Sequence, residues 1–496
     1  MLETVKSIKM SPKIKTRFAP SPTGQLHIGG LRTALYNYLF TKQHKGKFVL
    51  RIEDTDRSRY VENAEIKLIQ TLSKIGLNWD EGPVMGKTTE ITEKGQNKPY
   101  FQSKRVKIYQ EYAEKLIKSG NAYYCFCSED RLKKLREKQQ QNNQPTRYDG
   151  LCRKLSETEI QKKLQNQEPF VIRLKVPQSG EVTFKDIIRG QVKIQTEDID
   201  DQILFKSDGF PTYHLANVVD DNLMGITHVI RGEEWLPSTP KHILLYRALG
   251  WTMPQFAHLP LLLNPDRSKL SKRQSDVSVE DYLDKGYLPE ALLNYVALLG
   301  WHPKDDKEIF SLKNLIKHFD LQRVQKAGAI FDLKKLKWLN CHYIKQKPVK
   351  ELVKLCEKFL PEVDSKLLTK ILEVEKTRIE YLGEVGELAE FFIKLADYPA
   401  ALLIFKKSNK EKTLQGLKTA EDSLNNLKSW NKAKILQTLT KATEEFNLTN
   451  GDVFWPVRVA ASGKDKSPAP EEILEILGKE EGLKRIKLAR EKLNML

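Results

Sequence analysis

The amino-acid sequence predicts an α/β protein, in which a parallel-sheet domain is interrupted by an α+β insertion and followed by helices alone. Three observations predict this fold class. Strand and helix patterns alternate over residues 16–77, short strands separated by turns occupy residues 171–195, and after Pro289 apolar residues recur mainly at helical spacing.

The parallel sheet begins near the N-terminus. Residues 17–19 are short and extended, residues 31–40 carry Leu, Ala, Tyr and Phe at helical spacing, and residues 48–52 are a mostly apolar run typical of a buried strand. A similar pattern returns over residues 211–235. A split domain with an insertion between its halves explains both parts.

We therefore expect five parts along the chain. They are residues 1–99 and 206–250 for the two halves of the sheet domain, 100–205 for the insertion, 251–345 for a further domain, and 346–496 for a helical region.

Length and composition limit the class of protein. A chain of 496 residues is too long for one ordinary core, and 30% charged residues describe a water-soluble surface. The net charge of +18 raises the local concentration of polyanions, so nucleic acid is the leading partner. A generally basic composition explains the surplus equally well, so the motifs must decide.

The sequence shows neither a secretory signal nor a run of eighteen apolar residues, so we expect a cytoplasmic protein without a membrane span. Five cysteines in so long a chain do not suggest a disulfide framework. Cys341 and Cys356 lie in helical patterns, and we expect both to be core residues.

A glycine-containing turn follows the first strand and opens a helix, in the run Thr23-Gly-Gln-Leu-His-Ile-Gly-Gly30. Glycines let the backbone approach phosphates, and a helix N-terminus presents oriented N–H groups. His27 can hydrogen-bond phosphate oxygens as charge develops on them. Such turns are common, and a lone histidine is more often structural, so this run alone indicates only a candidate ATP site.

A second run, Lys269-Leu-Ser-Lys-Arg273, follows a strand-like segment and a turn. Two lysines three residues apart on a loop can close over a triphosphate and follow its charge to the leaving pyrophosphate. Alone, an exposed basic loop would be the simpler interpretation.

Together the two runs resemble, in order and separation, the ATP-binding signatures of class I aminoacyl-tRNA synthetases. Their flanks resemble the bacterial-type glutamyl-tRNA synthetase family more narrowly. The matching runs are Arg17-Phe-Ala-Pro-Ser-Pro-Thr-Gly24, Leu50-Arg-Ile-Glu-Asp-Thr-Asp56, Asp208-Gly-Phe-Pro-Thr-Tyr-His-Leu-Ala-Asn217, His228-Val-Ile-Arg-Gly-Glu-Glu-Trp235 and Pro456-Val-Arg-Val-Ala460. Gly30 stands where many class I enzymes have a second histidine, as in this branch of the class.

The resemblance implies a Rossmann-like catalytic domain, an insertion that binds the tRNA acceptor end, a stem-contact domain over residues 251–345 and all-α anticodon-binding domains. It implies ligation of L-glutamate to tRNA-Glu through glutamyl-adenylate, with ATP and Mg²⁺, by a monomer. Whether tRNA-Gln is also charged is left open.

The resemblance also assigns site residues. For glutamate, Arg17 would face the side-chain carboxylate and Glu53 the α-amino group, with the remaining contacts from Ala19, Ser21, Tyr213, Asn217 and Arg231. Two carboxylates and an ammonium call for this set of arginines and an acid. Catalysis would rest on His27, Lys269 and Lys272, and ATP would also contact Gly29, Gly30, Trp235 and Ser271.

The insertion holds Cys125-Phe-Cys127 and, after 24 intervening residues, Cys152. This spacing suggests a structural zinc site in a reducing compartment. Many bacterial relatives add a histidine two residues after the third cysteine, but Lys154 occupies that place, and Tyr148 is the candidate fourth ligand. The alternative is three thiols that bind no metal.

In the helical region, Arg378 falls where some bacterial members carry an arginine that contacts the third anticodon base. Glutaminyl-tRNA synthetases would end in β-barrels, a tRNA-modifying paralogue would stop after the catalytic domain, and a non-catalytic RNA-binding relative would have lost His27 or the lysines. The helical end of the chain and the retained residues therefore favour the glutamyl enzyme.

Overall fold

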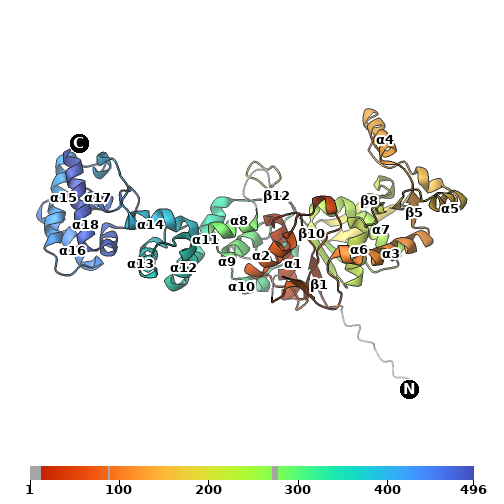
Figure 1. The fold of residues 1–496 in the computed structure, drawn as a ribbon, viewed down its shortest axis with the longest axis horizontal. Coiled ribbons are helices and arrows are strands. Elements are labelled where there is room, and N and C mark those ends of the chain that lie inside the picture. The colour runs from red at the N-terminus through yellow and green to blue at the C-terminus, as the bar shows by residue number, and fades with distance from the viewer. Residues whose placement is uncertain (1–12, 88–89, 271–277) are drawn as a thin grey trace, which may run out of the picture. The chain divides into compact units, whose positions relative to one another are not determined.

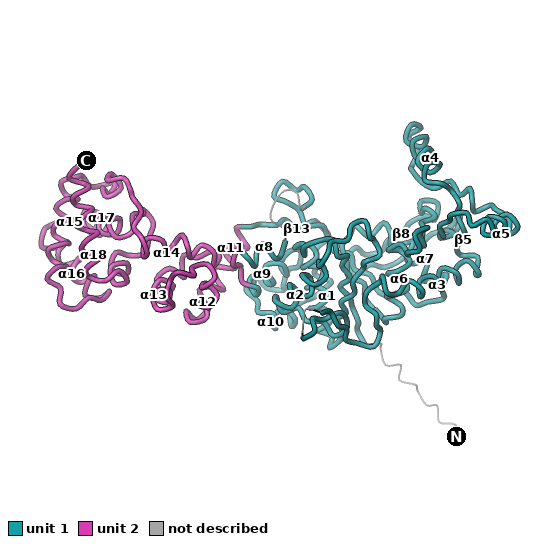
Figure 2. Tube along the Cα trace, in the orientation of Figure 1, with its two compact units in different colours: residues 1–284, 289–333 teal, residues 285–288, 334–496 magenta. Residues whose placement is uncertain are grey.

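The computed structural model describes residues 13–87, 90–270 and 278–496. Two compact units form, one from the described residues up to 284 together with 289–333, and the other from residues 285–288 and 334–496 (Figure 2). The predicted division into five parts is finer than these two units and stays a prediction. No helix in the described ranges is long and apolar enough to cross a bilayer.

Parallel strands form the centre of the first unit. Strand β1 (Lys15–Phe18) pairs in parallel with β2 (Lys47–Leu50), and β10 (His228–Gly232) pairs in parallel with β11 (Gln255–Leu259). The Thr227 N–H donates to the Lys15 carbonyl at 2.9 Å, so β10 begins beside the start of β1. Although β2 and β10 are far apart in sequence, they belong to one domain.

Buried helices connect these strands (Figure 1). They are α1 (Ile28–Gln43), α2 (Ala64–Lys74), α6 (Tyr213–Leu223) and α7 (Thr239–Ala248). Helix α1, which links β1 to β2, buries Ile28, Leu31, Leu35 and Leu39 completely. Apolar side chains on several faces of α1 therefore fix its position, and with it the position of its N-terminus.

The insertion contains its own three-stranded antiparallel sheet, in the order β5 (Ala122–Cys125), β6 (Val171–Leu174) and β9 (Ile203–Phe205). Its helices are α3 (Val106–Lys118), α4 (Glu129–Gln141) and α5 (Glu157–Gln165). The predicted α/β fold with an α+β insertion is confirmed.

One hairpin of the inserted segment joins the sheet of β10 and β11 instead. Strands β7 (Glu181–Asp186) and β8 (Gly190–Gln195) are antiparallel to each other, and β7 lies beside β11, so the strand order is β10–β11–β7–β8. The rings of Phe184 and Phe256 pack edge to face, 6.0 Å apart. This hairpin brings Asp186 to the edge of the sheet that carries the site described below.

Shorter elements complete the first unit. They are β3 (Gly82–Met85) paired with β4 (Ile91–Lys94), β12 (Leu262–Leu263) paired with β13 (Ala329–Ile330), and helices α8 (Val279–Lys285), α9 (Pro289–Ala297) and α10 (Leu312–His318).

The second unit is helical, as predicted. Its helices are α11 (Leu333–Gln346), α12 (Val349–Cys356), α13 (Ser365–Glu375), α14 (Val385–Ile393), α15 (Lys410–Asn425), α16 (Lys432–Glu445), α17 (Asn450–Ser462) and α18 (Pro470–Asn494). Cys356 is buried, which confirms its assignment to the core. The same prediction for Cys341 is wrong, because its helical position leaves the thiol half-exposed.

Candidate active site

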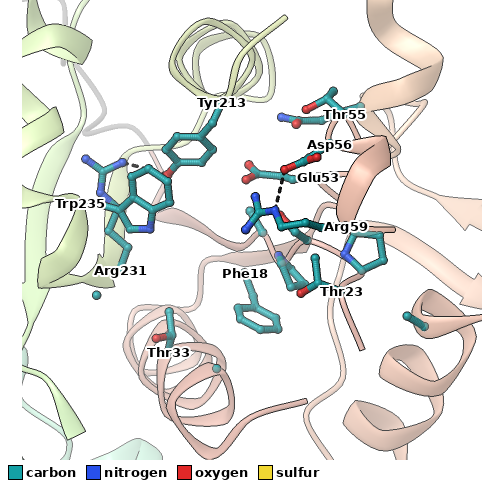
Figure 3. Close-up of a pocket in the computed structure, with 18 of the residues that line it drawn as sticks. Phe18, Thr23, Thr33, Glu53, Thr55, Asp56, Arg59, Tyr213, Arg231 and Trp235 are labelled. Carbon is teal, nitrogen blue, oxygen red and sulfur yellow. Dashed lines mark hydrogen bonds and ion pairs between the residues drawn. The ribbon is translucent and has the colours of Figure 1, made fainter. Parts of the chain in front are cut away.

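A cavity of about 870 Å³ lies at the carboxyl ends of β1, β2 and β10 (Figure 3). Ligands bind at this edge of α/β sheets, where loops diverge and helix N-termini converge. Most residues predicted for glutamate and ATP line it, namely Arg17, Ala19, Ser21, His27, Gly29, Gly30, Glu53, Tyr213, Arg231 and Trp235. The structure therefore brings together segments that are up to about 200 residues apart.

The glycine turn supplies one wall of this cavity. His27 is the N-cap of α1, and its Nδ1 accepts the Gly29 N–H at 2.9 Å. With Nδ1 accepting, a neutral imidazole carries its proton on Nε2, which makes that nitrogen a donor. The N-terminus of α1 and its oriented N–H groups therefore border the cavity together with a histidine donor.

Lys269 lines a smaller neighbouring cavity of about 190 Å³, together with His27, Gly29 and Gly30. Those three residues also line the large cavity, so Lys269 lies next to the wall formed by α1. The two other residues predicted from the same run, Ser271 and Lys272, lie outside the described residues.

Buried ion pairs hold Arg17, which lies on β1, and Glu53, which follows β2. The Arg17 Nε donates to both carboxylate oxygens of Asp221, at 3.0 and 3.1 Å. Arg51 donates to Asp221 at 2.8 Å and to the Glu53 Oε1 at 3.0 Å. Arg51 and Asp221 were not predicted as site residues, because in the sequence each is an ordinary polar residue within a strand or a helix pattern.

Burial dominates the electrostatics of Glu53. It raises the pKa of this carboxyl to about 7, although Arg51 and Arg17 act in the opposite direction. Burial also acts to raise the pKa of Asp221, but Arg17 and Arg51 outweigh it and hold that pKa below its ordinary value. Glu53 is thus the weaker acid of the two and borders the cavity.

Arg231 lies across the cavity from Glu53 (Figure 3), and its partners are neutral groups. Its Nη1 donates to the Tyr213 hydroxyl at 3.1 Å, and its Nη2 donates to the Thr239 Oγ1 at 2.9 Å. Within the part of the chain that the structure describes, no carboxylate pairs with Arg231, although only 4% of the residue is exposed. A buried cation without an anionic partner is costly, so a ligand carboxylate suits this position.

Of the predicted aromatic and amide side chains, Tyr213 and Trp235 line the cavity and Asn217 does not. The rings of Tyr213 and Trp235 pack beside the cavity with their centroids 4.0 Å apart and their planes inclined by 33°. Asn217 is buried behind this wall, where its Nδ2 donates to the Tyr213 carbonyl at 2.9 Å. The structure therefore does not place Asn217 on the cavity surface, because one helical turn of α6 separates it from the lining residue Tyr213.

The three cysteines of the insertion gather as the spacing suggested. The Sγ atoms of Cys125, Cys127 and Cys152 all lie within 4.8 Å of one another. The Tyr148 Oη lies 3.4 Å from the Cys125 Sγ and 3.5 Å from the Cys127 Sγ. Tetrahedral zinc holds its thiolates at about 2.3 Å, which places sulfur atoms roughly 3.8 Å apart, so the donor set fits this metal. Lys154 is exposed.

Arg378, in the second unit, follows α13 and is partly exposed. Its Nη1 donates to both carboxylate oxygens of Glu375, at 3.2 and 3.0 Å. Burial raises the pKa of Glu375 to about 7, against the effect of Arg378.

Comparisons with known proteins agree with this geometry. Residues 13–338 match the model of the catalytic domain of class I tRNA synthetases (E and Q), and residues 351–490 match the model of an anticodon binding domain. A glutamate–tRNA ligase of Clostridium tetani is 48% identical over 97% of this chain and 98% of its own length. One from Alkaliphilus metalliredigens is 45% identical over 97% and 99%.

Among solved structures, a glutamate tRNA ligase from Elizabethkingia meningosepticum in complex with its amino acid superposes with a TM-score of 0.87. It is 38% identical, and the match covers 97% of this chain and all of that one. The matched catalytic and anticodon-binding domains, and relatives nearly half identical over their whole length, show that the chain belongs to the glutamyl-tRNA synthetase family of class I tRNA synthetases.

Proposed function

We propose that this protein attaches L-glutamate to tRNA-Glu in the cytoplasm, acting as a monomer. One observation carries the proposal: a buried arginine that has no carboxylate partner among the described residues faces a buried acid across the cavity beside the α1 N-terminus. The curated relatives are named glutamate–tRNA ligases, and the solved relative was crystallised with its amino acid.

The charges of the cavity match those of glutamate. The substrate brings two carboxylates and one ammonium, and the cavity offers Arg17, Arg231 and Glu53. The Nε of Arg17 is held by Asp221, which leaves its two terminal nitrogens as donors toward a carboxylate. Arg231 would bind the other carboxylate beside Tyr213, while Glu53 would take the ammonium. Ala19 and Ser21 border the same space, and Asn217 would act by supporting Tyr213.

The reaction has two steps. The α-carboxylate oxygen of glutamate attacks the α-phosphorus of ATP, and the bond to pyrophosphate breaks to give glutamyl-adenylate. A ribose hydroxyl of the terminal adenosine of tRNA then attacks the carbonyl carbon, and AMP leaves. Neither step needs a protein nucleophile, so the chain contributes positioning and charge stabilisation.

The residues around α1 would hold the triphosphate. His27 would donate from Nε2, and the first N–H groups of α1 at Gly29 and Gly30 would face phosphate oxygens. Lys269 and Lys272 would follow the charge onto the leaving pyrophosphate, with Ser271 between them. Trp235 would border the nucleotide. Mg²⁺ bound to ATP would neutralise part of the phosphate charge.

The cysteine cluster would hold one structural Zn²⁺ in the insertion, with Tyr148 beside the three thiolates. Arg131 donates to the Cys127 Sγ at 3.4 Å, and the Arg173 guanidinium lies 4.1 Å from the Tyr148 ring centre. These cations would offset the net negative charge of three thiolates around a divalent ion.

Charging assays test the function. Purified enzyme, ATP and Mg²⁺ are combined with tRNA-Glu or tRNA-Gln, and with glutamate or glutamine, in all four pairs. We expect glutamate on tRNA-Glu, and Arg378 would favour tRNA-Glu over tRNA-Gln. If the enzyme attached glutamine to tRNA but did not attach glutamate, the proposal would be contradicted.

The variant K272A tests the role of the lysine loop. It should abolish tRNA-dependent pyrophosphate exchange while tRNA binding stays largely intact. Unchanged charging by this variant would rule out the assigned role of Lys272.

A further inference from the structure

A chain of buried polar groups lies behind Arg231 and runs through two strands of the sheet. The Arg231 Nε, on β10, lies 3.2 Å from the His258 Nε2, on β11. The His258 Nδ1 lies 2.6 Å from the Asp186 Oδ2, at the end of β7. Both His258 and Asp186 are essentially inaccessible to solvent, so these two groups are shielded from bulk water.

The direction of each hydrogen bond in this chain follows from arginine chemistry. A guanidinium only donates, so the His258 Nε2 accepts from Arg231 only when it carries no proton; the Thr239 Oγ1, 3.0 Å from the same nitrogen, can then turn its hydroxyl proton toward it. The remaining ring proton then lies on Nδ1 and is donated to Asp186. Burial lowers the pKa of His258, although Asp186 acts in the opposite direction, which agrees with a neutral ring.

Asp186 is itself held in one orientation. Its Oδ1 accepts the N–H groups of Ile188 and Arg189 at 2.9 and 2.8 Å. Its Oδ2 is therefore the oxygen that remains for His258. The turn between β7 and β8 thus fixes the carboxylate, and the carboxylate selects the imidazole tautomer.

A second histidine contacts the other side of the guanidinium. The His242 Nδ1 lies 3.2 Å from the Arg231 Nη2, which also donates to Thr239. Nη1 donates one N–H to the Tyr213 hydroxyl and has a second N–H for a ligand, while Nε is committed to His258. Rotation of the guanidinium about its own axis would break all of these contacts together.

We propose that Asp186 and His258 are positioning residues for glutamate binding: Asp186 selects the His258 tautomer that accepts from the Arg231 Nε, and this orients the arginine toward a substrate carboxylate. The inference rests on the proposed function of Arg231 and adds two residues that do not line the cavity. Orientation of a charged donor by a neutral acceptor leaves its charge available to the substrate.

The variant D186N tests this directly. The N–H groups of Ile188 and Arg189 require an oxygen at the Oδ1 position, so the amide nitrogen must face the His258 Nδ1. The imidazole is then forced to carry its proton on Nε2, where it opposes the Arg231 N–H and is left with the Thr239 Oγ1 as its acceptor. We expect the KM for glutamate to rise roughly ten- to a hundredfold, the loss typical of a hydrogen bond to a charged group, with the KM for ATP within about twofold.

The variant H258Q is the matched control. Its carboxamide oxygen can accept from the Arg231 Nε without any choice of tautomer, so Asp186 has no tautomer to select in this variant. Adding D186N to H258Q should therefore change the KM for glutamate by less than about twofold. If D186N raises the KM equally in both backgrounds, or raises the KM for ATP as much as that for glutamate, the positioning role is wrong.

The tautomer can also be measured in the wild-type protein itself. Nitrogen-15 chemical shifts of labelled histidine in the wild-type protein, with the His258 signal assigned by its loss in H258Q, should show the proton on Nδ1. A proton on Nε2 would overturn the inference. Wild-type enzyme that fails to charge tRNA-Glu with glutamate would instead refute the proposed function itself.

Discussion

Glutamate affinity should depend on pH through the protonation state of Glu53. Burial raises the pKa of this carboxyl to about 7 in the ligand-free protein. Only the ionised form can pair with the ammonium of the substrate, so protonation competes with binding. Free glutamate does not change its own charge between about pH 6 and 8, so a change of affinity in that range belongs to the protein.

The magnitude follows from the titration. With a pKa of about 7, roughly nine-tenths of Glu53 is ionised at pH 8 and roughly one-tenth at pH 6, so glutamate should bind about tenfold more weakly at pH 6. At pH 7, where half of the carboxyls are protonated, each glutamate bound should release about half a proton.

Isothermal titration calorimetry measures both quantities. Glutamate is titrated into the enzyme at several pH values, and at pH 7 in two buffers of different ionisation enthalpy, which counts the released protons. The variant E53Q should bind glutamate more weakly at pH 8 and show no proton release. A wild-type affinity that is constant from pH 6 to 8, or an E53Q variant with the same pH dependence as wild type, would refute the reasoning.

Three further predictions follow from the same structure. Because the pKa of Glu53 is raised, the folded state keeps a proton that the unfolded chain loses from about pH 4.5 upward. The free energy of unfolding should therefore fall by up to ~3 kcal/mol as the pH rises toward 7. The thermal unfolding temperature of E53Q should depend less on pH over that range. Elemental analysis should find about one zinc per chain, lost in C152S and kept in C341S; zinc that remains in C152S would contradict the cluster. The variant R378A should raise the KM for tRNA-Glu roughly tenfold with the KM for glutamate unchanged, whereas K370A, which removes an exposed charge on α13, should have a smaller effect; equal effects would mean that Arg378 contributes only charge.

Much of the fold could be predicted because its signals are local. The run at residues 48–52 is apolar enough to form a buried strand, and β2 forms there with the parallel pairing expected of a sheet domain. The position of α1 after a glycine turn was likewise readable from residues 23–40. Periodicity cannot report which strands become neighbours, so the pairing of β7 with β11 could not be foreseen.

In the candidate site, the residues that line the cavity could be predicted, whereas the buried residues that support them could not. Residues in distinctive runs, such as His27 and Tyr213, were found by the family resemblance, and the structure places them on the cavity wall. The supporting residues were missed because their partners are distant in sequence: Arg17 and Asp221 are 204 residues apart, and Asp186 and His258 are 72 apart. A buried aspartate in a sequence cannot be distinguished from an exposed one until the fold supplies its partner.

The hairpin β7–β8 has a consequence for anyone who trims this protein to a minimal catalytic core. Deleting residues 100–205 along the apparent sequence boundary would leave β11 as an unpaired sheet edge, with the Phe256 carbonyl deprived of the Ile187 N–H that it accepts at 2.9 Å. Exposed strand edges of this kind pair with other chains. Such a truncation should therefore self-associate, whereas one that removes the β5–β6–β9 sheet but keeps residues 181–195 should leave that edge covered.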